Sequence, residues 1–179
     1  MVNHELKFGG CVGLRRILDR VRDRLGAIVI AILVLGAIYL LPSGLPEALN
    51  GPAFVIDGDS LEIVGRRVRL YGIDAPERDQ ECRRDGRNWA CGQDAGVALR
   101  RKINGRAVNC EPIEFDQYDR ILARCRVGGE DLNAWLVRNG WAVSFGSYRD
   151  DENEARSNRQ GIWVGEFQRP WEWRRSHGI

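Results

Sequence analysis

Hydrophobic and polar residues alternate with two different periods in the chain after residue 52. Short apolar runs that end at turn-forming residues predict strands. Three longer stretches, 94–103, 132–139 and 150–160, have helical spacing, and a glycine closes each one. Short strands with helices inserted between them indicate a small β-barrel with packed helices, an α+β fold that is mainly β. The predicted strands are 54–56, 61–64, 68–73 and the two segments AVNCEPIEF and ILARCRV.

A continuous apolar pattern occupies Leu25–Leu41, which is 17 residues without a charge. At about 1.5 Å per residue it spans about 26 Å, just short of a ~30 Å hydrocarbon core. A buried core helix is a weaker alternative, because this helix would be apolar on every face. No convincing A-x-A-like site follows Leu41, so we expect a retained anchor rather than a cleaved signal peptide.

Charge adds an orientation to this picture. Residues 1–24 hold six basic and three acidic side chains, which favours a cytoplasmic amino terminus and export of the rest. We therefore expect a basic cytoplasmic segment (1–24), a transmembrane helix or uncleaved signal anchor (25–41), a linker (42–52), a folded domain (53–175) and a tail (176–179). The domain would lie at the cell membrane, on the periplasmic or extracellular side, or be secreted if the anchor is cleaved.

The cysteines provide a separate indication of compartment. Cys11 precedes the apolar segment, whereas four cysteines follow it, where an oxidising compartment permits disulfides. These four allow three connectivities, and the sequence alone does not choose among them. In one of these, Cys110 and Cys125, which lie in two strand-like runs joined by a turn, are bridged across neighbouring antiparallel strands. Cys82 and Cys91 would then close a short loop. A zinc site is disfavoured, because none of the cysteine spacings is a C-x-x-C pair.

Four acidic residues are expected to meet where two neighbouring strands end. Asp57 and Asp59 follow one strand, and Asp74 and Glu77 follow the strand that returns beside it. Carboxylates packed together repel one another unless a cation lies among them, and hard oxygen ligands suit calcium or magnesium. Arg69, on the returning strand, has the fork geometry that binds phosphate. A metal, an arginine and a spare carboxylate base are typical of a phosphodiesterase site.

Each half of this pattern has a structural alternative. Asp-Gly is a common hairpin turn, and Asp-Ala-Pro-Glu is compatible with a turn that begins a helix. The net charge of +2 adds no argument for a nucleic-acid partner, because the chain from Gly51 onward has 21 basic and 21 acidic residues. It is the presence of both halves on adjacent strands, with Arg69 between them, that favours function.

At these motifs the chain resembles the staphylococcal nuclease (thermonuclease) family. The resemblance covers about residues 53–175 and rests on five ordered motifs, which makes it specific. It implies an OB-type barrel of five strands with about three packed helices. The motifs are Asp57-Gly58-Asp59-Ser60, Arg69-Leu70 with Asp74-Ala75-Pro76-Glu77, Asp116-x-Tyr118-x-Arg120, the run from Leu136 to Ala142, and the tail Gly161-Ile162-Trp163 with Phe167, Pro170 and Trp173-Arg174.

The resemblance implies a calcium-dependent endonuclease that cuts DNA or RNA with little sequence preference. Calcium would be held by Asp59, Asp74 and the backbone carbonyl of Ala75, and Asp57 would support this loop. The alternative is a non-catalytic, membrane-anchored OB-fold module that only binds nucleic acid. We expect a monomeric catalytic domain that reaches the membrane through its N-terminal helix.

The resemblance also implies the reacting groups. Glu77 would be the general base that activates water, Arg69 and Arg120 would bind the phosphate, and Tyr118 would contact the substrate. The chain departs from the family's pattern at Asp119, where glycine is frequent, and we expect this acid to tilt or partly neutralise Arg120.

Overall fold

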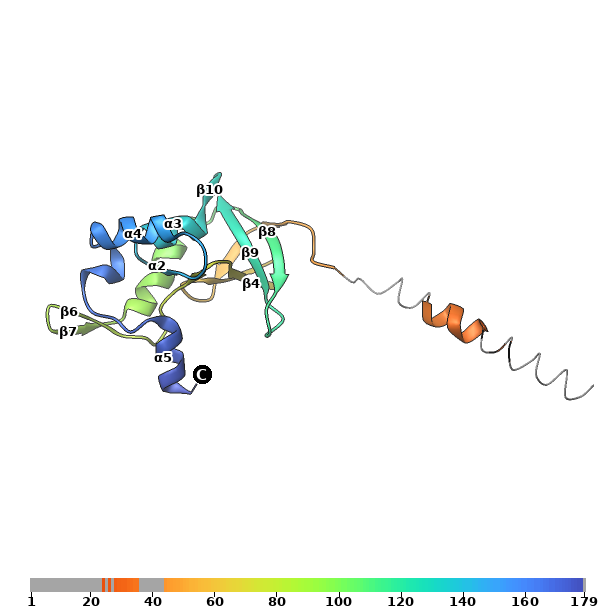
Figure 1. Ribbon diagram of the computed structural model, residues 1–179. Helices are drawn as coiled ribbons and strands as arrows, with labels where there is room; N and C mark the ends of the chain where they lie inside the picture. The colour runs from red at the N-terminus through yellow and green to blue at the C-terminus, as the bar shows by residue number, and fades with distance from the viewer. Residues whose placement is uncertain (1–23, 25, 27, 36–43, 179) are drawn as a thin grey trace, which may run out of the picture. The chain divides into compact units, whose positions relative to one another are not determined.

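The computed structural model describes residues 24, 26, 28–35 and 44–178 of the chain (Figure 1). Residues 28–35 are helical with exposed side chains, and a separate compact unit begins at Leu45. In the described part of the chain, no helix is both long and apolar enough to cross a membrane. The span predicted over 25–41 is described only in part, because 25, 27 and 36–41 fall outside these residues, and it stays a prediction.

A seven-stranded sheet forms the centre of the domain, in the order β1-β8-β9-β4-β3-β2, with β10 paired to β9. All neighbours are antiparallel except β4 and β9, which run parallel. The mixed α+β class, mainly sheet, is therefore confirmed. The strands are β1 (Leu49–Gly51), β2 (Ala53–Val55), β3 (Ser60–Ile63), β4 (Arg66–Leu70), β8 (Val108–Phe115), β9 (Ile121–Val127) and β10 (Glu130–Asp131).

The strand pairing returns to its starting point. Strands β1 and β2 are consecutive segments separated by Pro52, which has no backbone N–H to donate to a ladder. The first segment pairs with β8 and the second with β3. The two segments together with β3, β4, β9 and β8 therefore make a ring of five, which is consistent with the OB-type barrel implied by the motifs. Strand β1 lies within the stretch 42–52 predicted as a linker.

Alternation along the strands fills the inside of this ring. In β9 the side chains of Ile121, Ala123, Cys125 and Val127 are buried, and the residues between them are half-buried or exposed. This is the period of two that a half-buried strand requires. The hydrophobic core therefore consists of side chains from the inner face of these strands.

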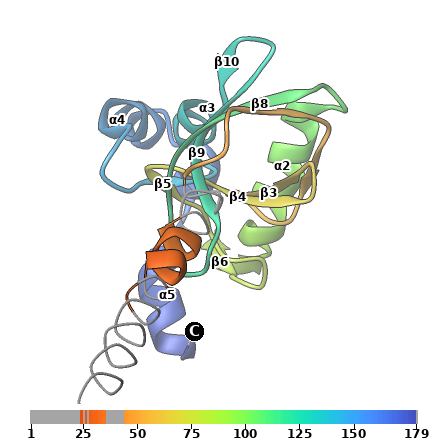
Figure 2. The same ribbon diagram turned by 90° about the vertical axis from the view of Figure 1, so that its right-hand side faces the viewer.

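The three predicted helices are present. Figures 1 and 2 show α3 and α4 side by side, and α2 packs against β2. A further helix begins with Pro170 in its first turn, where the missing N–H costs nothing, and was not predicted. The helices are α2 (Cys91–Ile103), α3 (Leu132–Arg138), α4 (Arg149–Ser157), the 3-10 helix η1 (Gly161–Val164) and α5 (Pro170–His177).

Two short sheets complete the domain and hold the loops around the site. Strand β5 (Ile73–Asp74) pairs with β11 (Val143–Ser144), and β6 (Cys82–Arg84) forms a hairpin with β7 (Arg87–Trp89). The expected disulfides are present, and the structure decides their connectivity among the three arrangements left open by the sequence. One joins Cys110 to Cys125 across β8 and β9, and the other joins Cys82 to Cys91, which connects the hairpin to the start of α2.

Asn133 on α3 connects the barrel to the segment that precedes the site. Its side chain is fully buried, accepts a hydrogen bond from the Cys125 N–H (3.1 Å), and donates to the carbonyls of Tyr71 (2.9 Å) and Ala123 (3.2 Å). The Ala123 carbonyl also accepts from the Tyr71 N–H (2.9 Å), so the Asn133 amide joins α3 to the point where β9 meets the segment after β4. Because Tyr71 follows β4 and precedes β5, this amide helps to fix where β5 begins.

Candidate active site

The loop between β2 and β3 presents the first pair of acids. Asp57 Oδ1 accepts a hydrogen bond from the Asp59 N–H (3.1 Å), a local turn that aspartate favours. A Cβ on Gly58 would lie 2.7 Å from the Cβ of Ala75 and 2.9 Å from that of Ala95, so only glycine allows this approach. Because Gly58 allows the loop to lie this close to Ala75, the Ala75 N–H donates a hydrogen bond to Asp59 Oδ2 (2.9 Å).

Arg69 joins the two acids that the motifs assign to the metal. It is paired with Ser60 in the β3–β4 ladder, so its side chain reaches the loop that follows β2. Its Nη1 donates to Asp59 Oδ1 (3.0 Å), and its Nη2 lies 2.6 Å from Asp74 Oδ1 and 3.0 Å from Asp59 Oδ2. Both acids are buried, with 3% of Asp59 and 1% of Asp74 exposed. The structure therefore brings these three predicted residues together.

A second arginine, which the motifs do not assign to the metal or the phosphate, contacts Asp74 and Glu77. Arg174 on α5 forks onto Asp74, with Nη1 at 3.0 Å from Oδ1 and Nη2 at 3.0 Å from Oδ2. Its Nη1 also donates to Glu77 Oε1 (2.6 Å). The one indication in the sequence was that Trp173-Arg174 belongs to the tail motif of the resemblance.

Glu77 follows β5 in a loop that its neighbours hold closely. The buried Gln80 donates its N–H to the Glu77 carbonyl (2.8 Å) and accepts from the Glu77 N–H through Oε1 (3.2 Å). The amide of Gln80 also donates to the carbonyl of Gln168, just before α5 (2.6 Å). Gln80 thus ties the segment of Glu77 to the segment that positions Arg174.

The electrostatics show an excess of negative charge. Burial, together with the charge of Asp59, raises the pKa of Asp57 to about 6. Burial also raises the pKa of Asp74, even though the hydrogen bonds and charges of two arginines act in the opposite direction. For Arg174, hydrogen bonds and charges from Asp74 and Glu77 outweigh burial and raise its pKa above the ordinary value. With all groups ionised, four acids face two arginines, which leaves two negative charges. The four acids are Asp57, Asp59, Asp74 and Glu77, and the two arginines are Arg69 and Arg174.

The donor set fits a calcium ion by its chemistry. Carboxylate oxygens are the ligands that calcium prefers, and two excess negative charges match a divalent cation. As the side chains stand, however, no group of three or more His, Cys, Asp or Glu among the described residues is placed to hold a metal. Guanidinium groups contact both oxygens of Asp59 and of Asp74 in this arrangement.

Tyr118 and Arg120 lie in the turn between β8 and β9. Within the described part of the chain, no hydrogen bond or ion pair joins them to Asp57, Asp59, Asp74 or Glu77, and their acidic partner is Asp116. Arg120 pairs with Asp116, with its Nε 2.7 Å from Oδ2, and packs on the ring of Tyr118 at 5.3 Å. Two hydrogen bonds from Arg120 outweigh burial and lower the pKa of Asp116. The acid that holds Arg120 is therefore Asp116, whereas the expected Asp119 has a φ of 58°, a left-handed conformation that suits glycine.

The start of α2 touches the backbone of Glu77. A Cβ on Gly92 would lie 1.7 Å from the Glu77 carbonyl oxygen, and the nearest atom to a Cβ on Gly96 is 3.6 Å away. Gly92→Ala is therefore expected to displace Glu77. Since a misplacement of about 1 Å costs up to about 10²-fold in rate, we expect a comparable loss of kcat/KM in the phosphodiester hydrolysis that the motifs imply. The matched control is Gly96→Ala in the same helix, which should keep its activity and gain up to about 1 kcal/mol in helix propensity. Equal activity of the two variants would contradict this coupling.

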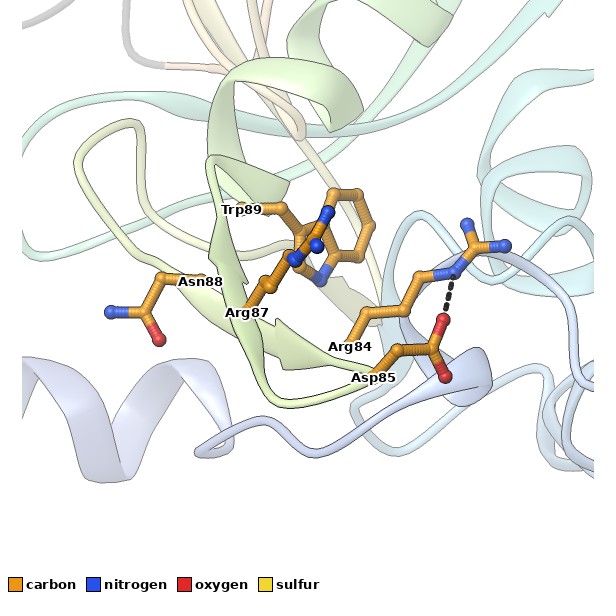
Figure 3. Close-up of a pocket in the computed structure, with 5 residues that line it drawn as sticks. All are labelled: Arg84, Asp85, Arg87, Asn88 and Trp89. Atoms are coloured by element: carbon orange, nitrogen blue, oxygen red, sulfur yellow. Dashed lines mark ion pairs between the residues drawn. The ribbon is translucent and has the colours of Figure 1, made fainter.

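A pocket lies elsewhere, on the β6–β7 hairpin (Figure 3). It is lined by Arg84, Asp85, Arg87, Asn88 and Trp89, and Figure 3 shows Arg84 and Asp85 as an ion pair (3.7 Å). None of the predicted site residues lines this pocket. The candidate active site is thus the acid and arginine cluster at the ends of β2, β4 and β5.

Comparison with known proteins shows which family the chain belongs to. The family model described as staphylococcal nuclease homologue matches residues 67–165. A succinoglycan biosynthesis protein, ExoI, of Rhizobium meliloti (strain 1021) is 39% identical over 129 residues, covering 68% of each chain. An uncharacterized endonuclease of Escherichia coli is 31% identical over 132 residues, covering 67% of this chain and 80% of its own.

A further match is part of a longer protein. A probable staphylococcal-like nuclease, CAN3, of Oryza sativa subsp. japonica is 31% identical over 123 residues, which are 64% of this chain and 30% of that protein. The match to the family model covers more than half of the chain. The chain belongs to the staphylococcal nuclease homologue family.

Proposed function

We propose that this chain is a calcium-dependent endonuclease that hydrolyses phosphodiester bonds of DNA, RNA or both with low sequence specificity and acts as a monomer. Membership of the nuclease family supports the reaction type. The observation that carries the proposal is the buried pair Asp59 and Asp74, bridged by Arg69 beside Glu77. Calcium, the choice of nucleic acid and the specificity belong to the proposal.

Each residue has a separate task in the proposed reaction. Asp59, Asp74 and the carbonyl of Ala75 would hold calcium, which supplies charge neutralisation and polarises the phosphate when bound. Glu77 takes a proton from the attacking water, and its tether to Gln80 keeps its backbone in place.

The arginines act on the phosphate. Arg69, between the acids, orients the phosphate and stabilises the negative charge that grows as water attacks in line and the 5′ oxygen leaves. Arg120 would approach the substrate from the β8–β9 turn, where Tyr118 is 63% exposed. Because Asp116 holds Arg120, substrate binding has to compete with that ion pair.

Purified protein should degrade plasmid DNA and single-stranded RNA when calcium is present and stop when a chelator is added. Calcium at 100 times its dissociation constant should also stabilise the fold by about 2.7 kcal/mol, read as a rise in Tm. The matched variant is Glu77→Gln, which keeps the shape of the side chain but loses the base and should lose most of the turnover. Degradation that continues unchanged in chelator would exclude the metal.

A non-catalytic nucleic-acid-binding module on the same fold is the second candidate. It would bind oligonucleotides without cutting them, with or without calcium. The retained acids and arginines argue against it, since a module that only binds has no need of a base beside buried carboxylates. Binding without any calcium-dependent product in the assay above would favour this candidate.

We also propose that residues 25–41 anchor the chain in the cell membrane with the domain on the periplasmic or extracellular side. Support comes from the uncharged apolar run, the basic residues before it and the two disulfides in the domain. An enzymatic reporter fused to the carboxyl terminus should work outside the cytoplasm. Activity of such a reporter in the cytoplasm alone would overturn this topology.

A further inference from the structure

Arg174 contacts the carboxylates that the proposed cofactor requires. Its fork covers both oxygens of Asp74 at 3.0 Å, and its Nη1 reaches Glu77 Oε1 at 2.6 Å. Paired charge-assisted hydrogen bonds of this kind are among the strongest that side chains make. The side chain of Arg174 is 26% exposed, so it covers the acids from the solvent side.

A cation bound by Asp74 needs lone pairs that this arginine already uses. Asp74 Oδ1 accepts from both Arg69 and Arg174, and its Oδ2 accepts from Arg174. A guanidinium also repels a nearby divalent cation, since both are positive. Arg174 and a bound cation are therefore alternatives at Asp74.

The helix itself is held by contacts that do not depend on this arginine. Pro170 is buried, the ring of Trp171 lies 6.1 Å from that of Phe145, and the Gln80 amide donates to the Gln168 carbonyl. The Arg174 side chain can therefore leave the acids by rotation while α5 stays docked.

We propose that Arg174 is a built-in counter-ion of Asp74 and Glu77 that competes with the divalent cation for these carboxylates. Arg174 thus acts as a positioning residue. Without the cation it offsets the repulsion among buried acids, and when the cation binds it moves away and frees Glu77. This inference rests on the proposed function, because it takes calcium as the competing ion. The competition raises the calcium concentration at which the site fills, which suits the millimolar calcium of an extracellular location.

The test is calcium titration by calorimetry of the purified protein and three variants, Arg174→Ala, Arg174→Lys and Arg175→Ala. We expect Arg174→Ala to bind calcium about tenfold or more tightly, because one competing charge and its hydrogen bonds are gone. Arg174→Lys keeps the positive charge but loses the two-pronged hydrogen bonding of the guanidinium. Its affinity for calcium should therefore lie between that of the wild type and that of Arg174→Ala. The exposed neighbour Arg175 is the matched control, and its replacement should leave the affinity unchanged.

Tighter calcium binding by Arg174→Ala cannot arise from misfolding, because misfolding would weaken calcium binding. A second readout follows the arginine directly. In NMR spectra of the labelled protein, the Nε–H resonance of Arg174, assigned by its loss in Arg174→Ala, should shift with calcium at the same concentration as the calorimetric transition.

Unchanged or weaker calcium affinity in Arg174→Ala, with the wild type binding calcium, would overturn the competition and leave the proposed function intact. Absence of calcium binding by both proteins would remove calcium as the cofactor and the competition with it. An Arg174 resonance that stays constant through a clear calorimetric transition would likewise show that the arginine remains on the acids.

Discussion

Replacing Arg69 by alanine is expected to lower kcat/KM for nucleic-acid hydrolysis by about 10²–10³. Arg69 is the residue that touches both Asp59 and Asp74 through its fork, so the variant loses a charge placed where the phosphate would lie. The same change leaves two buried acids with fewer partners. Removing one side of a buried ion pair costs about 3–5 kcal/mol, so the calcium-free variant should also be less stable.

Steady-state kinetics with excess calcium separates these effects, because calcium would restore the fold but not the phosphate contact. Circular dichroism at the assay temperature shows whether the variant is folded. Arg67→Ala is the matched control, because Arg67 lies two residues away on the same strand and is exposed. A folded Arg69→Ala protein with normal kcat/KM would remove Arg69 from the proposed mechanism.

Removing the disulfide between Cys110 and Cys125 is expected to lower the free energy of unfolding by about 3 kcal/mol, the loop-closure value for a separation of 15 residues. Both cysteines are fully buried between the longest strands, so alanine at both positions also leaves a small gap in the core. Urea denaturation of the double variant and of the wild type, each with and without reductant, measures the loss.

The bridge between Cys82 and Cys91 is the natural comparison. It closes a separation of 9 residues, so its loss should cost slightly less stability. It should cost more activity, however, because Cys91 precedes Gly92, which touches the Glu77 backbone. A double variant of Cys110 and Cys125 that is as stable as the oxidised wild type would show that the Cys110–Cys125 bridge adds nothing to the stability of the fold.

Much of the barrel and the centre of the site could be predicted from local patterns. The β3–β4 ladder brings Asp59 beside Arg69, because the neighbouring Ser60 pairs with Arg69, whereas the position of Asp74 in β5 also depends on its pairing with β11. The disulfide across β8 and β9 depends on the same kind of contact, because Cys110 and Cys125 are direct partners in an antiparallel pair. In both cases a single hairpin with period-two alternation decides the contact.

Other features depend on contacts between segments that are distant in the chain. The ion pair of Arg174 with Asp74 joins residues 100 positions apart, and it requires α5 to dock on the loop after β5. That docking in turn uses Gln80, which a sequence pattern would place in an ordinary polar loop.

The sequence by itself therefore determined the mainly β domain and the set of Asp59, Asp74 and Arg69 that carries the proposed chemistry, and for the cysteines it left three connectivities between which the folded strands decide. Tertiary structure alone decided that Asp116 holds Arg120 and that Arg174 covers Asp74 and Glu77. The physical reason is the range of the interactions. Alternation and turns act over a few residues and leave a mark in the sequence, whereas the pairing of charges depends on which surfaces the packed core brings together.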